Sequence, residues 1–265
     1  MPKGWHIVAV TLPSNVRIYL TGRMTLEADD RLIDQGVFPG LLGRAAFALL
    51  TLERGQPVSR GELTTVLWSN TPPPAHDVGL NAVMSRLRSV LMGVGFPSSV
   101  LSAASGCYQL NLPASTWVDV EAAIDAVHEA ESALRAGDPG RAYGPSAVAH
   151  HIARRPFLTG DDGRWAEDRR ERLRNILIRA LECRAQVYLW NHEYSLAVEA
   201  ARDAVRQEPL RETAHQLLMR AYAASGNTAE ALLAYERCRK LIAEELGVDP
   251  SPSTKALHVS LLESV

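Results

Sequence analysis

Apolar and polar positions follow two different periods along the chain, and the period changes near residue 40. Val16–Leu20 alternates apolar residues with Arg17 and Tyr19, which is the two-residue period of a half-buried strand. Turn residues separate similar short stretches, and strands are also expected over Ile7–Leu12, Met24–Ala28 and Leu32–Ile33. The pattern predicts a small antiparallel sheet in the first forty residues.

Helical spacing replaces this alternation in three stretches: Leu41–Glu53, Ser59–Trp68 and Asp77–Leu91. Ser59 followed three residues later by Glu62 is a capping box, so the second helix begins there. The prolines after Asn70 cannot be helical and predict a stiff loop before the third helix. Two further strands are expected after it, forming a hairpin at Val100–Ser102 and Tyr108–Leu112. This order of strands, three helices and a hairpin is the winged helix-turn-helix plan.

The third helix, Asp77–Leu91, has two distinct faces. Its apolar residues recur at three- and four-residue steps, at Leu80, Val83, Met84, Leu87, Val90 and Leu91. Opposite this stripe lie Ala82, Ser85 and Ser89, with Asn81 and Arg88 on one flank and Arg86 on the other. Small residues permit a close approach, asparagine bonds bidentately to adenine, and arginine binds guanine or phosphate. The face therefore suits a DNA major groove, although the pattern alone also fits an ordinary solvated surface helix.

From about Trp117 onward the chain is helical throughout, and two stretches match at an offset of 34 residues. Tyr188 then falls on Tyr222 and Ala197 on Ala231, so aromatic and small residues recur at the same steps. Small residues at these steps let antiparallel helices pack closely, and the period points to tetratricopeptide-like helix pairs. Such a layer either binds a partner in its inner face or serves as a plain scaffold or dimer interface.

Length and charge place these patterns in two domains. A chain of 265 residues is long for a single core, and we predict a first domain over residues 1–112 and a second over residues 113–265. The net charge is −2, but residues 1–112 carry nine Lys/Arg against seven Asp/Glu, and the remainder carries nineteen against twenty-three. The front is thus slightly basic and the rear acidic, which is the distribution expected of a DNA-binding front domain.

The sequence shows no arrangement of residues typical of an enzyme active site. It has no phosphate-cradling glycine loop, and His150-His151 has no carboxylate or cysteine at ligand spacing, so we expect no catalysis, no cofactor and no metal site. The three cysteines are far apart in sequence and suit isolated buried thiols in a reducing compartment. No apolar run is long enough to cross a bilayer and no export signal is evident, so a cytoplasmic protein without a membrane partner is expected.

The chain as a whole resembles the Streptomyces antibiotic regulatory proteins, which join an OmpR-type winged helix to a bacterial transcriptional activation domain of tetratricopeptide-like helices. The matching motifs in the front half are Val16–Gly22, Ala45–Leu52, Leu67-Trp68, Pro72-Pro73-Pro74, Ser85-Arg86-Leu87-Arg88 and Gly106-x-Tyr108-x-Leu110. Those in the rear half are Asp119-Val120, Ala136-Gly137-Asp138, Trp165-Ala166, Pro209-Leu210-Arg211-Glu212, Tyr222-Ala223-x-Ser225-Gly226 and Glu244-Glu245-Leu246-Gly247-x-Asp249-Pro250. The fold class so implied is an α+β winged helix-turn-helix followed by an all-α tetratricopeptide-like domain.

This resemblance implies a transcriptional activator that binds double-stranded DNA at direct-repeat promoter sites, usually beside a second protomer. It also implies recruitment of RNA polymerase with its sigma factor. The implied DNA contacts are Arg44, Asn81, Ser85, Arg86 and Arg88. The loop Ser69–His76, with Ser69, Asn70, Thr71 and His76, corresponds to the one that faces polymerase in OmpR-type proteins.

Two positions depart from the family pattern. Members often carry threonine where Gly79 stands and a basic residue where Ser89 stands. Glycine weakens a helix by roughly 1 kcal/mol relative to alanine, and a lost phosphate contact lowers affinity for DNA. These departures leave open a second interpretation, in which the chain is a protein-interaction adaptor whose winged helix no longer binds DNA by itself.

Overall fold

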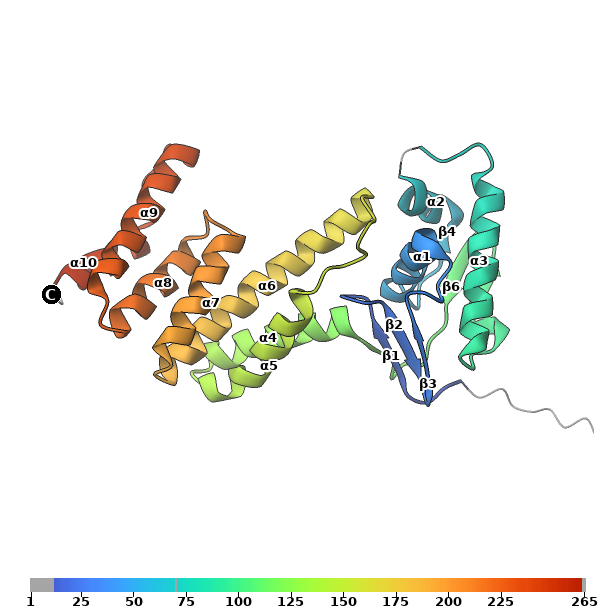
Figure 1. Ribbon diagram of the computed structural model, residues 1–265, viewed down its shortest axis with the longest axis horizontal. Helices are drawn as coiled ribbons and strands as arrows, with labels where there is room; N and C mark the ends of the chain where they lie inside the picture. The colour runs from blue at the N-terminus through green and yellow to red at the C-terminus, as the bar shows by residue number, and fades with distance from the viewer. Residues whose placement is uncertain (1–11, 70, 264–265) are drawn as a thin grey trace, which may run out of the picture. The chain divides into compact units, whose positions relative to one another are not determined.

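The computed structural model describes residues 12–69 and 71–263 (Figure 1). Its described residues form two compact units. Of the described residues, the first unit comprises those up to Val120 together with Arg155–Arg170, and the second comprises Glu121–Arg154 and the residues from Glu171 onward. The strand expected over Ile7–Leu12 lies outside the described residues except for Leu12. The chain thus has a small β-sheet region at its front followed by a helical domain.

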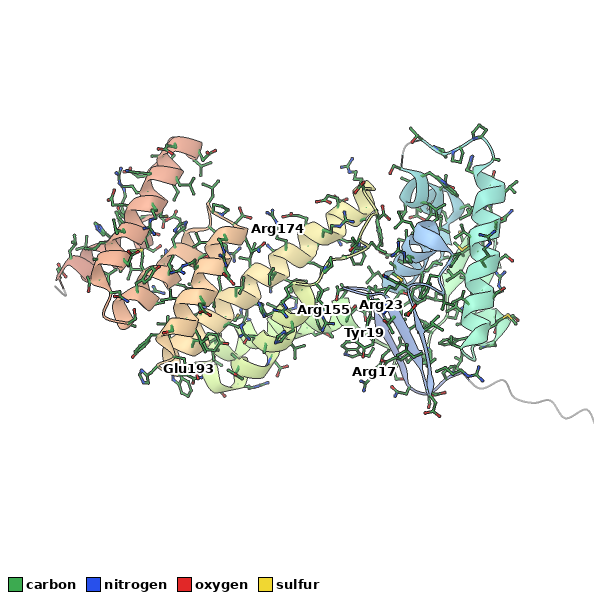
Figure 2. The ribbon with its side chains drawn as sticks, in the orientation of Figure 1. Arg17, Tyr19, Arg23, Arg155, Arg174 and Glu193 are labelled. Atoms are coloured by element: carbon green, nitrogen blue, oxygen red, sulfur yellow. The ribbon has the colours of Figure 1, made fainter. Side chains whose placement is uncertain are left out.

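The first sheet contains three of the strands that the sequence predicts. They are β1 (Val16–Tyr19), β2 (Thr25–Ala28) and β3 (Arg31–Asp34), paired antiparallel in the order β3-β2-β1. Val16 and Ile18 of β1 are buried. Arg17 and Tyr19, both labelled in Figure 2, lie on the opposite, more exposed face of the strand. The two-residue period therefore identified β1 and β2 and their buried side, whereas β3 has no buried residue.

A fourth strand, β7 (Trp117–Val118), extends this sheet by pairing parallel to β1. The next residue, Asp119, is fully buried, and its carboxylate accepts hydrogen bonds from the backbone of Leu20 (2.9 Å) and from both the backbone (2.9 Å) and the hydroxyl (2.7 Å) of Thr21. Burial raises the pKa of Asp119, and these donors oppose the rise by stabilising the ionised form. The sequence did not indicate this strand, because two residues show no periodicity.

Three helices follow the sheet: α1 (Gly40–Leu52), α2 (Arg60–Trp68) and α3 (His76–Gly93). The predicted capping box is confirmed, because the Ser59 hydroxyl accepts from the backbone of Glu62 (3.1 Å) and the Glu62 carboxylate accepts from the backbone of Ser59 (2.8 Å). Every residue of α1 from Ala45 to Thr51 is buried, so this helix is the centre of the front core.

The hairpin after α3 is also present. A short 3-10 turn, η1 (Ser98–Val100), leads into β5 (Leu101–Ala104), which pairs antiparallel with β6 (Cys107–Leu110). A third strand, β4 (Val58–Ser59), pairs with β6 and completes a sheet in the order β4-β6-β5. This pairing joins the start of α2 to the hairpin, and the sequence did not indicate it.

The segment Arg155–Arg170 folds with the first unit, although it lies far along the chain. Phe157 is 2% exposed and forms a β-bridge with Thr21, while the backbone of Gly22 donates to the carbonyl of Pro156 (2.7 Å). Arg170 holds the segment in shape by donating to the carbonyls of Phe157 (3.0 Å) and Leu158 (2.9 Å). The structure therefore divides the chain differently from a single boundary after residue 112, because contacts distant in sequence decide which unit a segment joins.

The second unit is entirely helical in its described residues. Its elements are α4 (Asp119–Arg135), α5 (Pro139–Ala153), α6 (Arg164–Trp190), α7 (Tyr194–Gln207), α8 (Glu212–Ala224), α9 (Thr228–Leu246) and α10 (Pro252–Glu263). The first residues of α4 and of α6 belong to the front unit. Cys183 and Cys238 are buried and Cys107 partly buried, and all three are free thiols, as expected.

The helix pairs follow the 34-residue offset read from the sequence. The small residues Ala197, Ala201 and Ala231 are completely buried, which lets neighbouring helices approach closely. The second copy is longer: α9 has 19 residues, whereas α7 has 14. The tetratricopeptide-like arrangement of helix pairs is confirmed.

Candidate nucleic-acid interface

The outer face of α3 is the feature that the sequence singled out. Leu80, Val83, Met84, Leu87 and Leu91 are buried, so the apolar stripe packs into the front core as predicted. The residues on the other side are exposed: Asn81, Ala82, Ser85, Arg86 and Ser89. Side chains project from this side of the helix away from α1 (Figure 2). The helix therefore offers a narrow, mostly small-residue surface.

Arg86 is the cation that this surface leaves available. Its side chain is exposed and makes no hydrogen bond or ion pair within residues 12–69 and 71–263. Ser85 is exposed one residue earlier, and its carbonyl accepts the Ser89 hydroxyl (3.1 Å). Ser89 is thus bonded back to its own helix, whereas Arg86 can reach an external anion.

Arg88 has a different environment from Arg86. Its guanidinium donates through Nε (3.3 Å) and Nη2 (2.9 Å) to the carbonyl of Leu101, the first residue of β5. The side chain is only partly exposed. Its first role is therefore to attach the hairpin to α3, a contact that the sequence did not indicate.

Arg44 lies on α1, where its Nη1 donates to the Gln35 amide oxygen at 3.4 Å. The side chain is partly exposed. It belongs to a different helix from the other four candidates, and the structure leaves its role as a phosphate contact a prediction.

Arg60, which the sequence did not single out, joins α2 to the start of α3. Its Nη2 atom donates to the Asp77 carboxylate at 2.7 Å. The hydrogen bond from Arg60 holds the pKa of Asp77 below its ordinary value, and the same contact raises the pKa of Arg60. The acidic residue also complements the positive end of the helix dipole in the first turn of α3.

Asn81 is held by the same arginine. Arg60 Nη1 donates to Asn81 Oδ1 at 2.9 Å and to the Tyr108 hydroxyl at 3.1 Å, and that hydroxyl donates to Asn81 Oδ1 at 3.3 Å. Three elements, α2, α3 and β6, therefore meet at this one amide oxygen. No local sequence signal marks Arg60 or Tyr108 for this role, because each is separated from Asn81 by a turn or a strand.

The loop between α2 and α3 matches the expected stiff connection. Ser69 has a left-handed backbone (φ 53°), and the Thr71 amide donates to the carbonyl of Trp68 at 3.2 Å. His76 is the first residue of α3, and its Nδ1 atom lies 3.0 Å from the carbonyl oxygen of Pro73. Asn70 lies outside the described residues. The polymerase-facing role expected of this loop stays a prediction.

Two further properties concern the described residues as a whole. They contain no group of three or more His, Cys, Asp and Glu side chains placed to hold a metal ion. No helix among them combines the length and hydropathy needed to span a bilayer.

Comparison with known proteins identifies the class. The bacterial transcriptional activator domain family matches residues 118–262, which is more than half of the chain. The regulatory protein AfsR of Streptomyces coelicolor is 34% identical over 221 residues, covering 83% of this chain and 22% of AfsR. The transcriptional regulatory protein EmbR of Mycobacterium tuberculosis is 29% identical over 221 residues, covering 83% of this chain and 57% of EmbR. Both of these relatives are regulatory proteins by name, EmbR a transcriptional one.

A solved structure extends the likeness to the fold. Mycobacterium tuberculosis EmbR, determined in complex with a low-affinity phosphopeptide, superposes with a TM-score of 0.83 at 26% sequence identity, covering 94% of this chain and 65% of that one. The chain belongs to the Streptomyces antibiotic regulatory protein family, whose shared element is the bacterial transcriptional activator domain. It spans about a fifth of the length of AfsR and somewhat over half that of EmbR.

Proposed function

We propose that this protein is a sequence-specific transcriptional activator whose front unit is an OmpR-type winged helix-turn-helix, with α3 entering the major groove of promoter DNA. The observation that carries the proposal is the outer face of α3, where small exposed residues surround an arginine with no partner among the described residues. A helix needs such a face to approach base edges closely. The hairpin β5–β6 is the wing, which Arg88 attaches to that helix.

The second part of the proposal concerns assembly. We propose that two protomers bind direct-repeat sites side by side and that the loop Ser69–His76 faces RNA polymerase and its sigma factor. The loop fits this role because Ser69 and the residues from Thr71 to Ala75 are exposed and its prolines stiffen it. Such a regulator acts on the chromosome and is therefore cytoplasmic.

The decisive experiment measures binding of the full chain to duplexes from the promoters flanking its own gene, by fluorescence anisotropy at increasing salt. Arg86→Ala should weaken binding by roughly 5- to 100-fold, because a guanidinium contact in the groove is lost. Arg220→Ala, an exposed arginine of α8 in the helical unit, is the matched control and should leave binding unchanged. Affinity should also fall steeply with salt through counterion release.

One observation favours the adaptor as a second candidate. Arg60 and Arg88 bond within the protein, so Arg86 alone supplies free positive charge to the exposed face of α3 among the described residues. An adaptor would bind polymerase while showing no salt-dependent association with any duplex. Unaltered duplex binding by Arg86→Ala would contradict the major-groove placement of α3.

A further inference from the structure

The amide of Asn81 is oriented by its neighbours in a way that limits which base it can read. Its oxygen lies 2.9 Å from Arg60 Nη1 and 3.3 Å from the Tyr108 hydroxyl. Arg60 Nη1 also donates to that hydroxyl at 3.1 Å, so the three groups form a closed triangle. The second guanidinium nitrogen, Nη2, is engaged with Asp77 at 2.7 Å, which fixes the position of the whole fork.

A count of donors and acceptors leaves one orientation for the amide. The two hydrogens of Arg60 Nη1 go to Asn81 and Tyr108, and the single hydroxyl hydrogen of Tyr108 goes to Asn81. Both lone pairs of Oδ1 are thereby used. A flipped amide would point its NH2 group at a guanidinium that can only donate, which is repulsive. Asn81 Oδ1 therefore faces inward.

This orientation of the amide determines what the nitrogen of Asn81, Nδ2, can bind. Nδ2 has no hydrogen-bond partner among the described residues, and Asn81 is exposed on the outer face of α3. The usual asparagine–adenine pair needs a donor and an acceptor together, because adenine presents N7 as acceptor and its N6 amino group as donor. With its oxygen occupied, Asn81 offers donors alone.

We infer that Asn81 reads an acceptor edge in the major groove, with guanine N7 and O6 as its ligand, and does not form the bidentate pair with adenine. This inference rests on the proposed placement of α3 against base edges. Guanine is the base that presents two acceptors side by side there, whereas thymine presents one acceptor beside a methyl group. Arg60 and Tyr108 act as positioning residues, because they set the orientation of the amide without touching the base.

The test begins with the full chain and a library of duplexes varied one base pair at a time. The wild-type protein should prefer guanine at one base pair of each half-site, and replacing that guanine by 7-deazaguanine should lower affinity about 5- to 20-fold. Asn81→Asp places a carboxylate oxygen where Nδ2 stood, so the preference at this base pair should change from guanine to cytosine, which presents a donor. Preferences at the other positions should stay as in the wild type.

Two further variants separate positioning from a merely structural role. Arg60→Met releases Asn81 Oδ1 from its charged donor, so the amide can turn and adenine should become tolerated at the same base pair. Asn81→Ala should lose preference at that base pair alone, which keeps the inference testable if Asn81→Asp does not fold. Thermal unfolding monitored by circular dichroism checks the fold of each variant.

The outcomes that overturn the inference are distinct from those that overturn the proposed function. If the wild-type protein binds duplex and prefers adenine at the base pair that Asn81 contacts, and loses affinity when the N6 amino group is removed, the inference is wrong while the proposed function stands. An Asn81→Asp variant with the wild-type base profile refutes it as well. If no duplex binds at any salt concentration, the major-groove placement fails and the inference fails with it.

Discussion

Arginine side chains have contrasting surroundings in the two units. In the helical unit Arg179 makes two hydrogen bonds to Glu131 (2.6 and 2.7 Å), and Arg211 makes two to Glu182 (both 2.8 Å). On the outer face of α3, Arg86 has no partner among the described residues. The two pairs of the helical unit attach α6 to α4 and to the residue before α8, and in the front unit Arg60 is likewise paired with Asp77. The outer face of α3 differs because its exposed arginine has no carboxylate partner among the described residues.

Net charge alone would not reveal this contrast. The helical part carries more arginines than the front part and is nevertheless acidic overall. What distinguishes the DNA-facing candidate is an arginine without a carboxylate beside it on a face of small residues.

The first prediction tests whether the segment Arg155–Arg170 folds as part of the front unit. Phe157→Ala should destabilise that unit by about 3–5 kcal/mol, because Phe157 is 2% exposed and its removal leaves a cavity beside Thr21 and the indole of Trp165. Hydrogen exchange of peptides from residues 16–34 should accelerate, and duplex binding should be lost at lower urea. Met219→Ala, a fully buried residue of α8, is the control and should accelerate exchange in the helical unit instead. Unchanged exchange in β1 would exclude the segment from the front fold.

The second prediction concerns the paired arginines. Glu131→Gln should cost the helical unit about 1–3 kcal/mol at neutral pH, because a charge-assisted pair of hydrogen bonds is lost. Glu171→Gln is the matched control, since its pair with Arg174 is more exposed and should contribute less than about 1 kcal/mol. Urea unfolding followed by helical circular dichroism measures both. Equal effects would show that burial does not distinguish the two pairs.

The same pair predicts a pH dependence. Hydrogen bonds from Arg179 lower the pKa of Glu131 below its ordinary value of 4.5. A carboxyl with a lowered pKa in the folded state contributes stability above its unfolded pKa and loses it as pH falls toward the folded one. The wild-type helical unit should therefore lose stability below pH 4.5, and the Glu131→Gln variant should lose less over the same range. Parallel stability curves for the two proteins would contradict this assignment.

The third prediction separates two arginines of α3 that the sequence treated alike. Arg88→Ala should lower stability by about 1 kcal/mol, because its bonds to the carbonyl of Leu101 attach the hairpin to the helix. Arg86→Ala should change stability by less than about 0.5 kcal/mol, since its exposed side chain makes no hydrogen bond or ion pair among the described residues. Thermal unfolding compares the two variants, and a larger stability loss for Arg86→Ala would reverse their assigned roles.

The smallest expected effect is that of Gly79→Ala. Alanine favours a helix by roughly 1 kcal/mol over glycine, but the added methyl would lie 3.3 Å from Cζ2 of Trp68, so part of that gain is spent moving the indole. A net stabilisation of about 0.5 kcal/mol is expected. Thermal unfolding measures it, and a net loss of stability would show that Trp68 cannot move.

The sequence by itself determined most of the longer elements of this protein and the buried side of several of them, although it did not indicate the two-residue strands β4 and β7. Two-residue alternation located β1 and β2, the capping box of Ser59 and Glu62 located the start of α2, and the 34-residue offset located the helix pairs. It also separated the buried stripe of α3 from its exposed face. These features depend on neighbours within a few residues, which periodicity records directly.

Only the tertiary structure decided which distant segments meet. It pairs β7 with β1, returns Phe157 to Thr21 and brings Arg60 and Tyr108 to Asn81. It also separates Arg88, which bonds to the hairpin, from Arg86, which does not. A hydrogen bond between groups remote in sequence leaves no period along the chain, because it depends on how whole elements pack.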